Sequence, residues 1–108
     1  MGKELNAEYY CEQGEKEFKA GYLEKAIDCY TQAIKKDPKC ADAYFNRGAC
    51  NLGKNEPDYQ SARKDFLTAL DLNPKDAGFC YLNLAEVETG TGNHKKAMEY
   101  STKAKEFI

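Results

Sequence analysis

The sequence predicts an all-α fold, a solenoid of about six helices stacked as antiparallel pairs. The main observation is an internal repeat with a period of 34 to 37 residues, which is typical of stacked helical hairpins. Each repeat carries a tyrosine, a small residue four positions later, and two alanines seven positions apart. These markers are Tyr10, Gly14, Ala26 and Ala33, then Tyr44, Gly48, Ala62 and Ala69, then Tyr81, Ala85, Ala97 and Ala104. A second observation is that no strand-like alternation of apolar and polar residues competes with this interpretation.

The first three helical segments are bounded by glycine and proline. The first covers residues 5–19 and ends before Gly21, and the second covers residues 23–36. Asp37-Pro38 ends the second segment, because proline disfavours helical geometry in the residue before it. The third segment covers residues 41–53, and a longer loop follows it.

The last three segments are bounded in the same way. Pro57 suits the first turn of the fourth helix, where its missing N–H is not needed, and this helix continues as far as Asn73-Pro74. The fifth segment covers residues 78–89, and Gly90 and Gly92 make the turn after it. The sixth segment takes up the rest of the chain.

Small residues are expected to bring the two helices of each pair close together. Glycine inside a helix costs up to ~1 kcal/mol relative to alanine, so Gly14 and Gly48 at equivalent positions indicate a packing requirement. The expected contacts are Gly14 with Ala26, Gly48 with Ala62, and Ala85 with Ala97. The second alanine of each repeat would then allow the next pair to stack.

The composition favours a cytoplasmic protein without a membrane or nucleic-acid partner. No run approaches the ~18 apolar residues of a membrane helix, and the polar start lacks the apolar core of a signal peptide. The net charge is −2, without a basic patch of the kind that binds nucleic acid. The cysteines are odd in number and contain no CxxC pair, so we expect free thiols packed as small apolar residues. They are Cys11, Cys29, Cys40, Cys50 and Cys80, with redox sensing and metal binding as alternatives.

The sequence offers no complete catalytic site. A hydrolase needs a nucleophile, a base and an oxyanion site. The sole histidine, His94, lies in the turn after Gly92, where a polar ring at a helix start is an ordinary feature. Gly90-Thr91-Gly92 also lacks the further residues of a phosphate-binding loop. We therefore expect no enzyme, and no catalytic, cofactor or metal site.

The repeats resemble the tetratricopeptide repeat family over nearly the whole chain. Its pattern is matched by Tyr10, Gly14, Ala26, Tyr30, Ala33 and Pro38, by Tyr44, Gly48, Ala62, Phe66, Ala69 and Pro74, and by Tyr81, Leu84, Ala85, Gly92, Ala97 and Ala104. The departures are Gln13 and Arg47 for Leu, Glu17 and Glu88 for Tyr, and Ser101 for an aromatic residue. The resemblance implies one domain over residues 1–108, a right-handed superhelix with repeats at about 7–40, 41–76 and 78–108.

The resemblance also implies a concave groove that binds a peptide segment of a partner protein. The first helix of each pair would line it, at positions three or four residues apart that share one helix face. The lining residues are Glu8, Cys11, Glu12, Glu15, Phe18, Lys19, Asp42, Phe45, Asn46, Ala49, Phe79, Leu82, Asn83 and Glu86.

One version of this groove in the family clamps the C-terminal carboxylate of heat-shock chaperone tails ending in EEVD. That clamp uses two Lys, two Asn and an Arg, of which only Asn46 is matched here. Cys11, Glu15, Phe79 and Asn83 stand at the other positions. A carboxylate needs cationic or amide donors, so the residues argue against EEVD tails, which stay as an alternative.

The charge of the groove helices favours a basic partner. Residues 5–19, 41–53 and 78–90 contain seven acidic and three basic residues, around an apolar strip of Phe45, Phe79 and Leu82. We expect a segment with Lys or Arg flanking apolar anchors, such as a short helix lying in the groove. The alternative is that the acids only form a solvated helix face.

Two further alternatives concern the role of the whole chain. It is interpreted as an adaptor, co-chaperone or assembly factor, and the first alternative is a regulatory module cut from a larger multidomain enzyme. The second is a structural role with self-association through the C-terminal end, where Phe107 and Ile108 are apolar. Against that, Ser101 and Lys105 give the last helix a polar outer face, as terminal repeats require.

Overall fold

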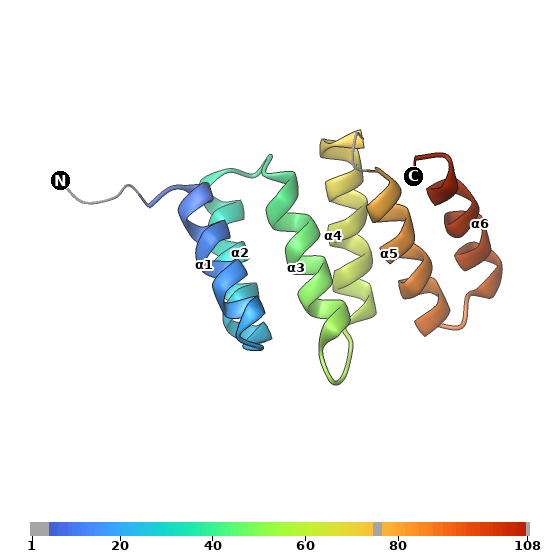
Figure 1. Ribbon diagram of the computed structural model, residues 1–108, viewed down its shortest axis with the longest axis horizontal. Coiled ribbons are helices and arrows are strands. Elements are labelled where there is room, and N and C mark those ends of the chain that lie inside the picture. The colour runs from blue at the N-terminus through green and yellow to red at the C-terminus, as the bar shows by residue number, and fades with distance from the viewer. Residues whose placement is uncertain (1–4, 75–76, 108) are drawn as a thin grey trace.

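The residues that the structure describes form six α-helices (Figure 1). The structure is a computed structural model that describes residues 5–74 and 77–107. Within these residues there is no strand, which confirms the all-α prediction. The helices are α1 Ala7–Lys19, α2 Leu23–Lys36, α3 Ala41–Gly53, α4 Tyr59–Leu72, α5 Ala77–Gly90 and α6 His94–Lys105.

The helix ends agree with the sequence signals, apart from corrections at the start of α4 and at the end of α5. Asn6 caps α1 by accepting a hydrogen bond from the Tyr9 N–H at 2.9 Å. Pro57 does not lie in the first turn of α4, because Asp58 is the cap and accepts from the Ser61 N–H at 3.1 Å. A carboxylate that receives a helix N–H stabilises the start of the helix, so the helix begins after this aspartate.

Gly90 and Gly92 have different roles, although the sequence analysis assigned both to one turn. Gly92 has a φ of 82°, a left-handed conformation that favours glycine. Gly90 is the last residue of α5, and the ring of Tyr59 occupies the place where a Cβ of residue 90 would lie. Gly92 therefore makes the turn, whereas Gly90 makes room for a neighbouring helix.

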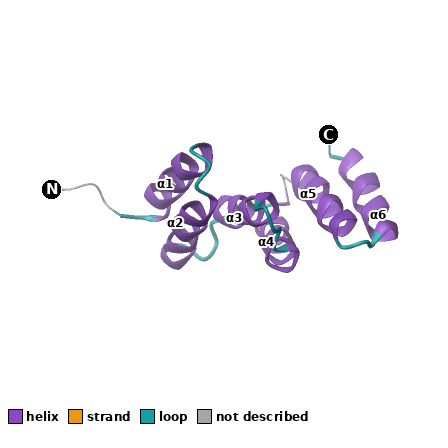
Figure 2. Ribbon diagram, turned by 90° about the horizontal axis from the view of Figure 1, so that it is seen from below, coloured by secondary structure: helices purple, strands orange, loops and turns teal. Residues whose placement is uncertain are grey.

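Each helix packs on its neighbours in the chain. The pairs α1–α2, α3–α4 and α5–α6 are in close contact, and α2 packs on α3 as α4 packs on α5. The only other contacts between described helices are slighter ones of α3 with α1 and with α5. In Figure 2, α1 lies above α2 and α3 above α4, whereas α5 and α6 lie side by side. The result is an elongated stack of 53 × 30 × 20 Å.

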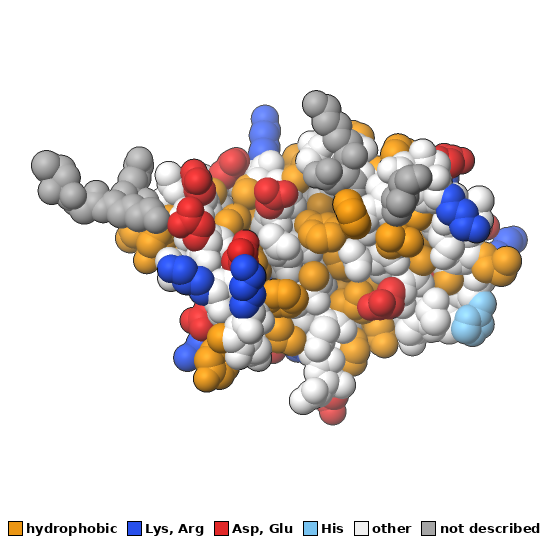
Figure 3. Space-filling model, in the orientation of Figure 1, with side chains coloured by type: hydrophobic (Ala, Val, Ile, Leu, Met, Phe, Trp, Pro, Cys, Tyr) orange, Lys and Arg blue, Asp and Glu red, His pale blue; other side chains and the backbone are white. Residues whose placement is uncertain are grey.

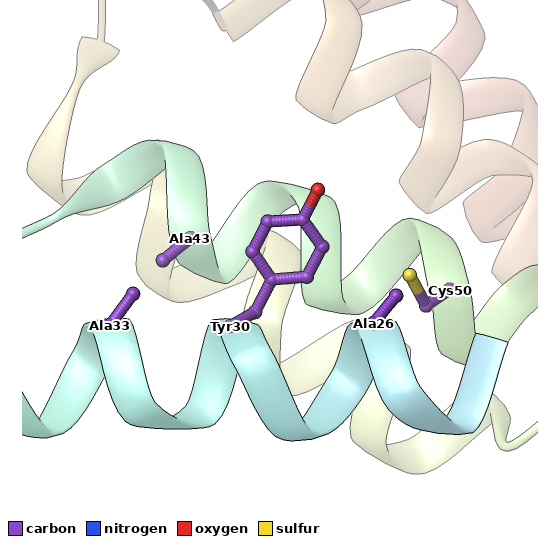
Figure 4. Close-up of a cluster of buried hydrophobic side chains, with 5 residues drawn as sticks. All are labelled: Ala26, Tyr30, Ala33, Ala43 and Cys50. Atoms are coloured by element: carbon purple, nitrogen blue, oxygen red, sulfur yellow. The ribbon is translucent and has the colours of Figure 1, made fainter. Parts of the chain in front are cut away.

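Two buried clusters hold the stack together. The first lies between α2 and α3, where Tyr30 points toward α3, Ala33 faces Ala43 and Ala26 faces Cys50 (Figure 4). The second joins α4 and α5 through Ala62, Phe66, Leu84 and Val87. Burying apolar side chains between successive pairs is what stabilises a solenoid, because a single pair cannot cover its own apolar face.

The expected contacts of the small residues are only partly right. A Cβ on Gly14 would lie 2.7 Å from Cζ of Tyr30, and one on Gly48 would lie 3.0 Å from Cε1 of Phe66. In each case the atom nearest to the added Cβ belongs to an aromatic ring on the second helix, not to Ala26 or Ala62. Glycine is required here because the ring fills the space that a methyl group would need.

Candidate peptide-binding groove

The predicted lining residues all lie at least partly open to solvent. On α1, Cys11 is half-buried and the other predicted residues are exposed. On α3 and α5, Asp42, Phe79, Leu82 and Glu86 are exposed, whereas Phe45, Asn46, Ala49 and Asn83 are half-buried. Their accessibility is what a binding surface requires, and their role in binding stays a prediction.

A hollow of about 390 Å³ lies where α3 and α5 begin and α4 ends. Its lining is mostly apolar and comprises Ala41, Asp42, Phe45, Ala69, Asn73, Phe79 and Cys80. The structure therefore brings three predicted residues, Asp42, Phe45 and Phe79, around one hollow. Figure 3 shows hydrophobic side chains gathered over this part of the molecule.

Four lining residues of the hollow were not predicted from the sequence. Ala69 and Asn73 come from the end of α4, a second helix of a pair, and only first helices were expected to contribute. Ala41 and Cys80 flank predicted positions on α3 and α5. Asn73 ends α4 in the Asn-Pro turn, so its place beside the first helices depends on how the pairs stack.

The aromatic residues of the hollow differ in how firmly they are held. Phe45 packs edge-on against the buried Phe66, with 5.6 Å between ring centroids, and so belongs partly to the core. Phe79 is 61% exposed, and Leu82, one turn further along α5, is 45% exposed. Exposed apolar side chains beside a hollow often mark a binding site. Phe79 is therefore the side chain best placed to contact a ligand.

The acidic surplus of the groove helices persists in the structure, with a smaller set of charges. Arg47 pairs with Asp65 at 2.8 Å and Glu88 pairs with Arg63 at 2.8 Å, so both belong to pairs with α4. Glu15 pairs with Lys19 on the surface at 2.9 Å. Glu88 and Arg47 are therefore set aside as members of these pairs. Removing one acidic and one basic residue leaves the surplus of acidic over basic residues in the groove helices unchanged. The acidic side chains concentrate over α1 (Figure 3).

The side chains at the carboxylate-clamp positions offer few donors. Burial, with the neighbouring Cys40 and Asp42, raises the pKa of Cys11 to about 12, so its thiol stays neutral. The Asn83 amide donates to the Phe79 carbonyl oxygen at 3.0 Å within its own helix. Neither residue supplies the free cationic donor that a terminal carboxylate needs.

Two further features of the described part of the chain concern metal ligands and membrane-spanning helices. The residues that the structure describes contain no group of three or more His, Cys, Asp or Glu side chains placed to hold a metal ion. His94 is exposed at the start of α6. Among the described helices, none has the length and apolarity needed to cross a membrane.

Two family models match parts of the chain, one over α1 to α3 and the other over α5 and α6. One, described as "TPR repeat", matches residues 14–54, and another, described as "Tetratricopeptide repeat", matches residues 80–107. The chain belongs to the tetratricopeptide repeat family. Six helices in three pairs agree with three such repeats.

Several known proteins are similar to this chain in sequence or in structure. The chain is 44% identical over 75 residues to Protein unc-45 homolog B from Danio rerio, across 65% of this chain and 8% of that protein. It superimposes with a TM-score of 0.88 and 25% identity on the second TPR of Spaghetti (RPAP3) bound to HSP90 peptide SRMEEVD, covering 96% of this chain and 94% of that one. The structure of MamA matches with a TM-score of 0.86 and 26% identity, covering 94% and 58%. The chain spans less than half the length of the curated relatives it matches.

Proposed function

We propose that this chain is a protein-interaction module that binds a short segment of a partner protein in its groove, as an adaptor, co-chaperone or assembly factor. The observation that carries the proposal is the apolar hollow with the exposed side chain of Phe79 at its edge. A related fold that holds a peptide, the RPAP3 domain, supports this use of the scaffold. The role is binding, not catalysis.

The chemistry of the groove favours a segment with apolar anchors flanked by Lys or Arg. An apolar side chain would enter the hollow, where it is removed from water and gains free energy in proportion to the buried area. Basic flanks would lie near Asp42 and the predicted groove acids of α1, Glu8, Glu12 and Glu15, which are all exposed. Opposite charges at a rim mainly increase the association rate and the specificity.

A chaperone tail ending in EEVD is the second candidate, because the RPAP3 domain is described with such a peptide. This chain has Cys11, Glu15 and Phe79 where that mode of binding uses cationic or amide side chains, and its groove carries surplus acids. An acidic tail would meet like charges, and Asn46 is the one clamp donor that is matched. We therefore place basic segments ahead of EEVD tails.

Binding of two sets of labelled peptides distinguishes between the two candidate partners. Labelled peptides with a Phe or Leu anchor would be flanked either by Lys and Arg or by Asp and Glu, and SRMEEVD would be included. Fluorescence anisotropy with purified protein should show binding of the basic set, weakening as salt rises. Tighter binding of SRMEEVD than of any basic peptide would overturn the choice of partner.

Phe79→Glu should weaken binding of the best peptide at least tenfold, equivalent to about 1.4 kcal/mol. It places a charge in the hollow but alters an exposed side chain, so the fold should be retained in circular dichroism. Met98→Glu is the matched control, because Met98 is 72% exposed on α6. Equal losses in both variants would show that the hollow is not the site. Phe45→Glu is less informative, since it also removes a contact with Phe66.

A further inference from the structure

Two half-buried cysteines meet where the first helix pair joins the second. Cys11 lies in the middle of α1, and Cys40 is the N-cap residue of α3. Their Sγ atoms are 3.8 Å apart, with one thiol donating to the other. The contact brings together residues 29 positions apart in the chain. Cys50 and Cys80 are instead buried in the core.

We propose that Cys11 and Cys40 form a dithiol site that closes to a disulfide when a low-molecular-weight disulfide, such as glutathione disulfide, is present. A disulfide bond is about 2.05 Å long, so the two sulfur atoms need to approach by about 1.8 Å. Cys40 lies at a helix cap in an extended conformation, with φ −77° and ψ 90°, not inside a helical turn. Closing this distance requires changes in the side-chain torsions of both residues.

The reaction proceeds by two thiol–disulfide exchanges. The Cys40 thiolate attacks one sulfur of glutathione disulfide, forms a mixed disulfide and releases one glutathione thiolate. The Cys11 thiolate then attacks the Cys40 sulfur, forms the Cys11–Cys40 bond and releases the second glutathione thiolate. Each protein thiol gives its proton to solvent and each leaving thiolate takes one up. The protein loses two electrons and two protons, and glutathione disulfide gains them.

The surroundings of Cys11 set the order of these steps. At neutral pH its thiol is protonated, because burial, Cys40 and Asp42 all disfavour the thiolate. We assign the first attack to Cys40, since desolvation at Cys11 disfavours the Cys11 thiolate. Once Cys40 is in a mixed disulfide, it can neither carry a thiolate charge nor share a proton, so two causes of the low acidity of Cys11 disappear. The second step should accelerate as pH rises, because the thiolate is the nucleophile.

The disulfide would connect two helices that otherwise touch only slightly. It joins α1 to α3 and closes a loop that contains all of α2. Closing such a loop reduces the conformational freedom of the unfolded chain and stabilises the folded one. We expect the midpoint of thermal unfolding to rise on the order of 10 °C and to return after reduction.

Peptide mapping tests the proposal directly. The folded protein is incubated with glutathione disulfide at pH 8, blocked with iodoacetamide and digested with trypsin without reduction. The expected product links the tryptic peptides 4–16 and 40–47, which contain Cys11 and Cys40. Thermal unfolding is followed on the same samples before and after reduction.

Three serine variants make the result specific. Cys11→Ser and Cys40→Ser should each abolish the linked peptide and the rise in the unfolding midpoint. Cys29→Ser is the matched control, because Cys29 is also half-buried, and it should change neither. A stable mixed disulfide on Cys40, a bond to another cysteine, or linkage between two molecules would each overturn the proposal. The readout is a covalent bond, so the outcome does not depend on peptide binding.

Discussion

At the scale of single residues, glycine and aromatic side chains occur together across the helix pairs. Gly14 lies against Tyr30 and Gly48 against Phe66. The third repeat has Ala85 and Ser101 at the equivalent positions. In the third repeat, the aromatic ring and the glycine are therefore both replaced. This agrees with steric exclusion, because an alanine fits where no ring fills the space.

Gly14→Ala should destabilise the protein by about 1–2 kcal/mol, because overpacking against the buried Tyr30 ring outweighs the better helix propensity of alanine. The new Cβ would lie 2.7 Å from Cζ of Tyr30, which is only 2% exposed and has little room to move. Urea denaturation of both proteins measures the difference in the free energy of unfolding.

Gly53→Ala is the control for this prediction. Its Cβ would have Leu23 as nearest neighbour at 3.8 Å, an ordinary contact. We expect this variant to be as stable as the wild type or slightly more so. A Gly14→Ala variant that is also neutral would mean that the Tyr30 ring shifts without cost.

At the scale of elements, two arginine–carboxylate pairs connect α4 to the helices on either side. Arg47 on α3 donates to both carboxylate oxygens of Asp65 at 2.8 and 2.9 Å, and also to Thr31 on α2. Arg63 on α4 donates to both oxygens of Glu88 on α5 at 2.8 and 3.2 Å. Such two-point pairs fix orientation as well as distance. Arg47 and Glu88 depart from the family pattern, and each departure is matched by a partner of opposite charge.

Glu88→Gln should destabilise the protein by about 1–3 kcal/mol at pH 7, because it leaves Arg63 without its charged partner. The side chain of Glu88 is 3% exposed, whereas that of Arg63 is 32% exposed, so solvent compensates only in part. Hydrogen bonding to Arg63 lowers the pKa of Glu88 below its ordinary value of 4.5.

The pH dependence of this difference follows from the direction of that shift. A carboxyl group with a lowered pKa in the folded state contributes stability above its unfolded pKa and loses it as pH falls through the folded pKa. The gap between wild type and Glu88→Gln should therefore be widest above pH 4.5 and narrow on acidification. Chemical denaturation from pH 7 to pH 3 measures it. Glu15→Gln, in an exposed pair, should show no such gap.

At the scale of the whole molecule, stability depends on contacts between neighbours in the stack. The first and last helices have fewer neighbours than α3, which contacts α1, α2, α4 and α5. In such a linear arrangement the ends open more easily than the centre.

Hydrogen exchange should therefore show slower exchange of the amides of α3 and α4 than of those of α1 and α6. Mass spectrometry of proteolytic fragments after timed exposure to deuterated water provides the comparison. Uniform protection of all six helices would indicate that the molecule opens only as a whole. If oxidation removed the difference in amide exchange between α1 and the central helices, but not that between α6 and the central helices, the result would agree with a Cys11–Cys40 link.

The fold was predictable because it depends on local signals repeated three times. Proline and glycine mark the helix ends, and their effect on backbone geometry acts within a few residues. The error at Pro57 arose because Asp58 is also a helix cap, and two competing local signals can only be ranked in the structure. The role of Gly90 was missed because Tyr59 lies 31 residues earlier in the chain and meets it only through packing.

The candidate site was predictable only in part. The helix period placed Asp42, Phe45 and Phe79 on accessible helix faces, and that depends only on their spacing along each helix. Two features of the hollow depend on how α4 lies against α3 and α5. One is the contribution of Ala69 and Asn73, and the other is the difference between Phe45, which packs on Phe66, and the exposed Phe79. Spacing along one helix contains no information about the angle between two helices.

The sequence by itself determined the six helices, the repeat and the family, because periodicity and turn residues act locally and recur in each repeat. Only the tertiary structure decided which side chains meet across repeats. The contacts of Cys11 with Cys40, Arg63 with Glu88 and Gly14 with Tyr30 each join different helices. Such contacts depend on the packing of side chains between helices, which is set by the shape and volume of every neighbour.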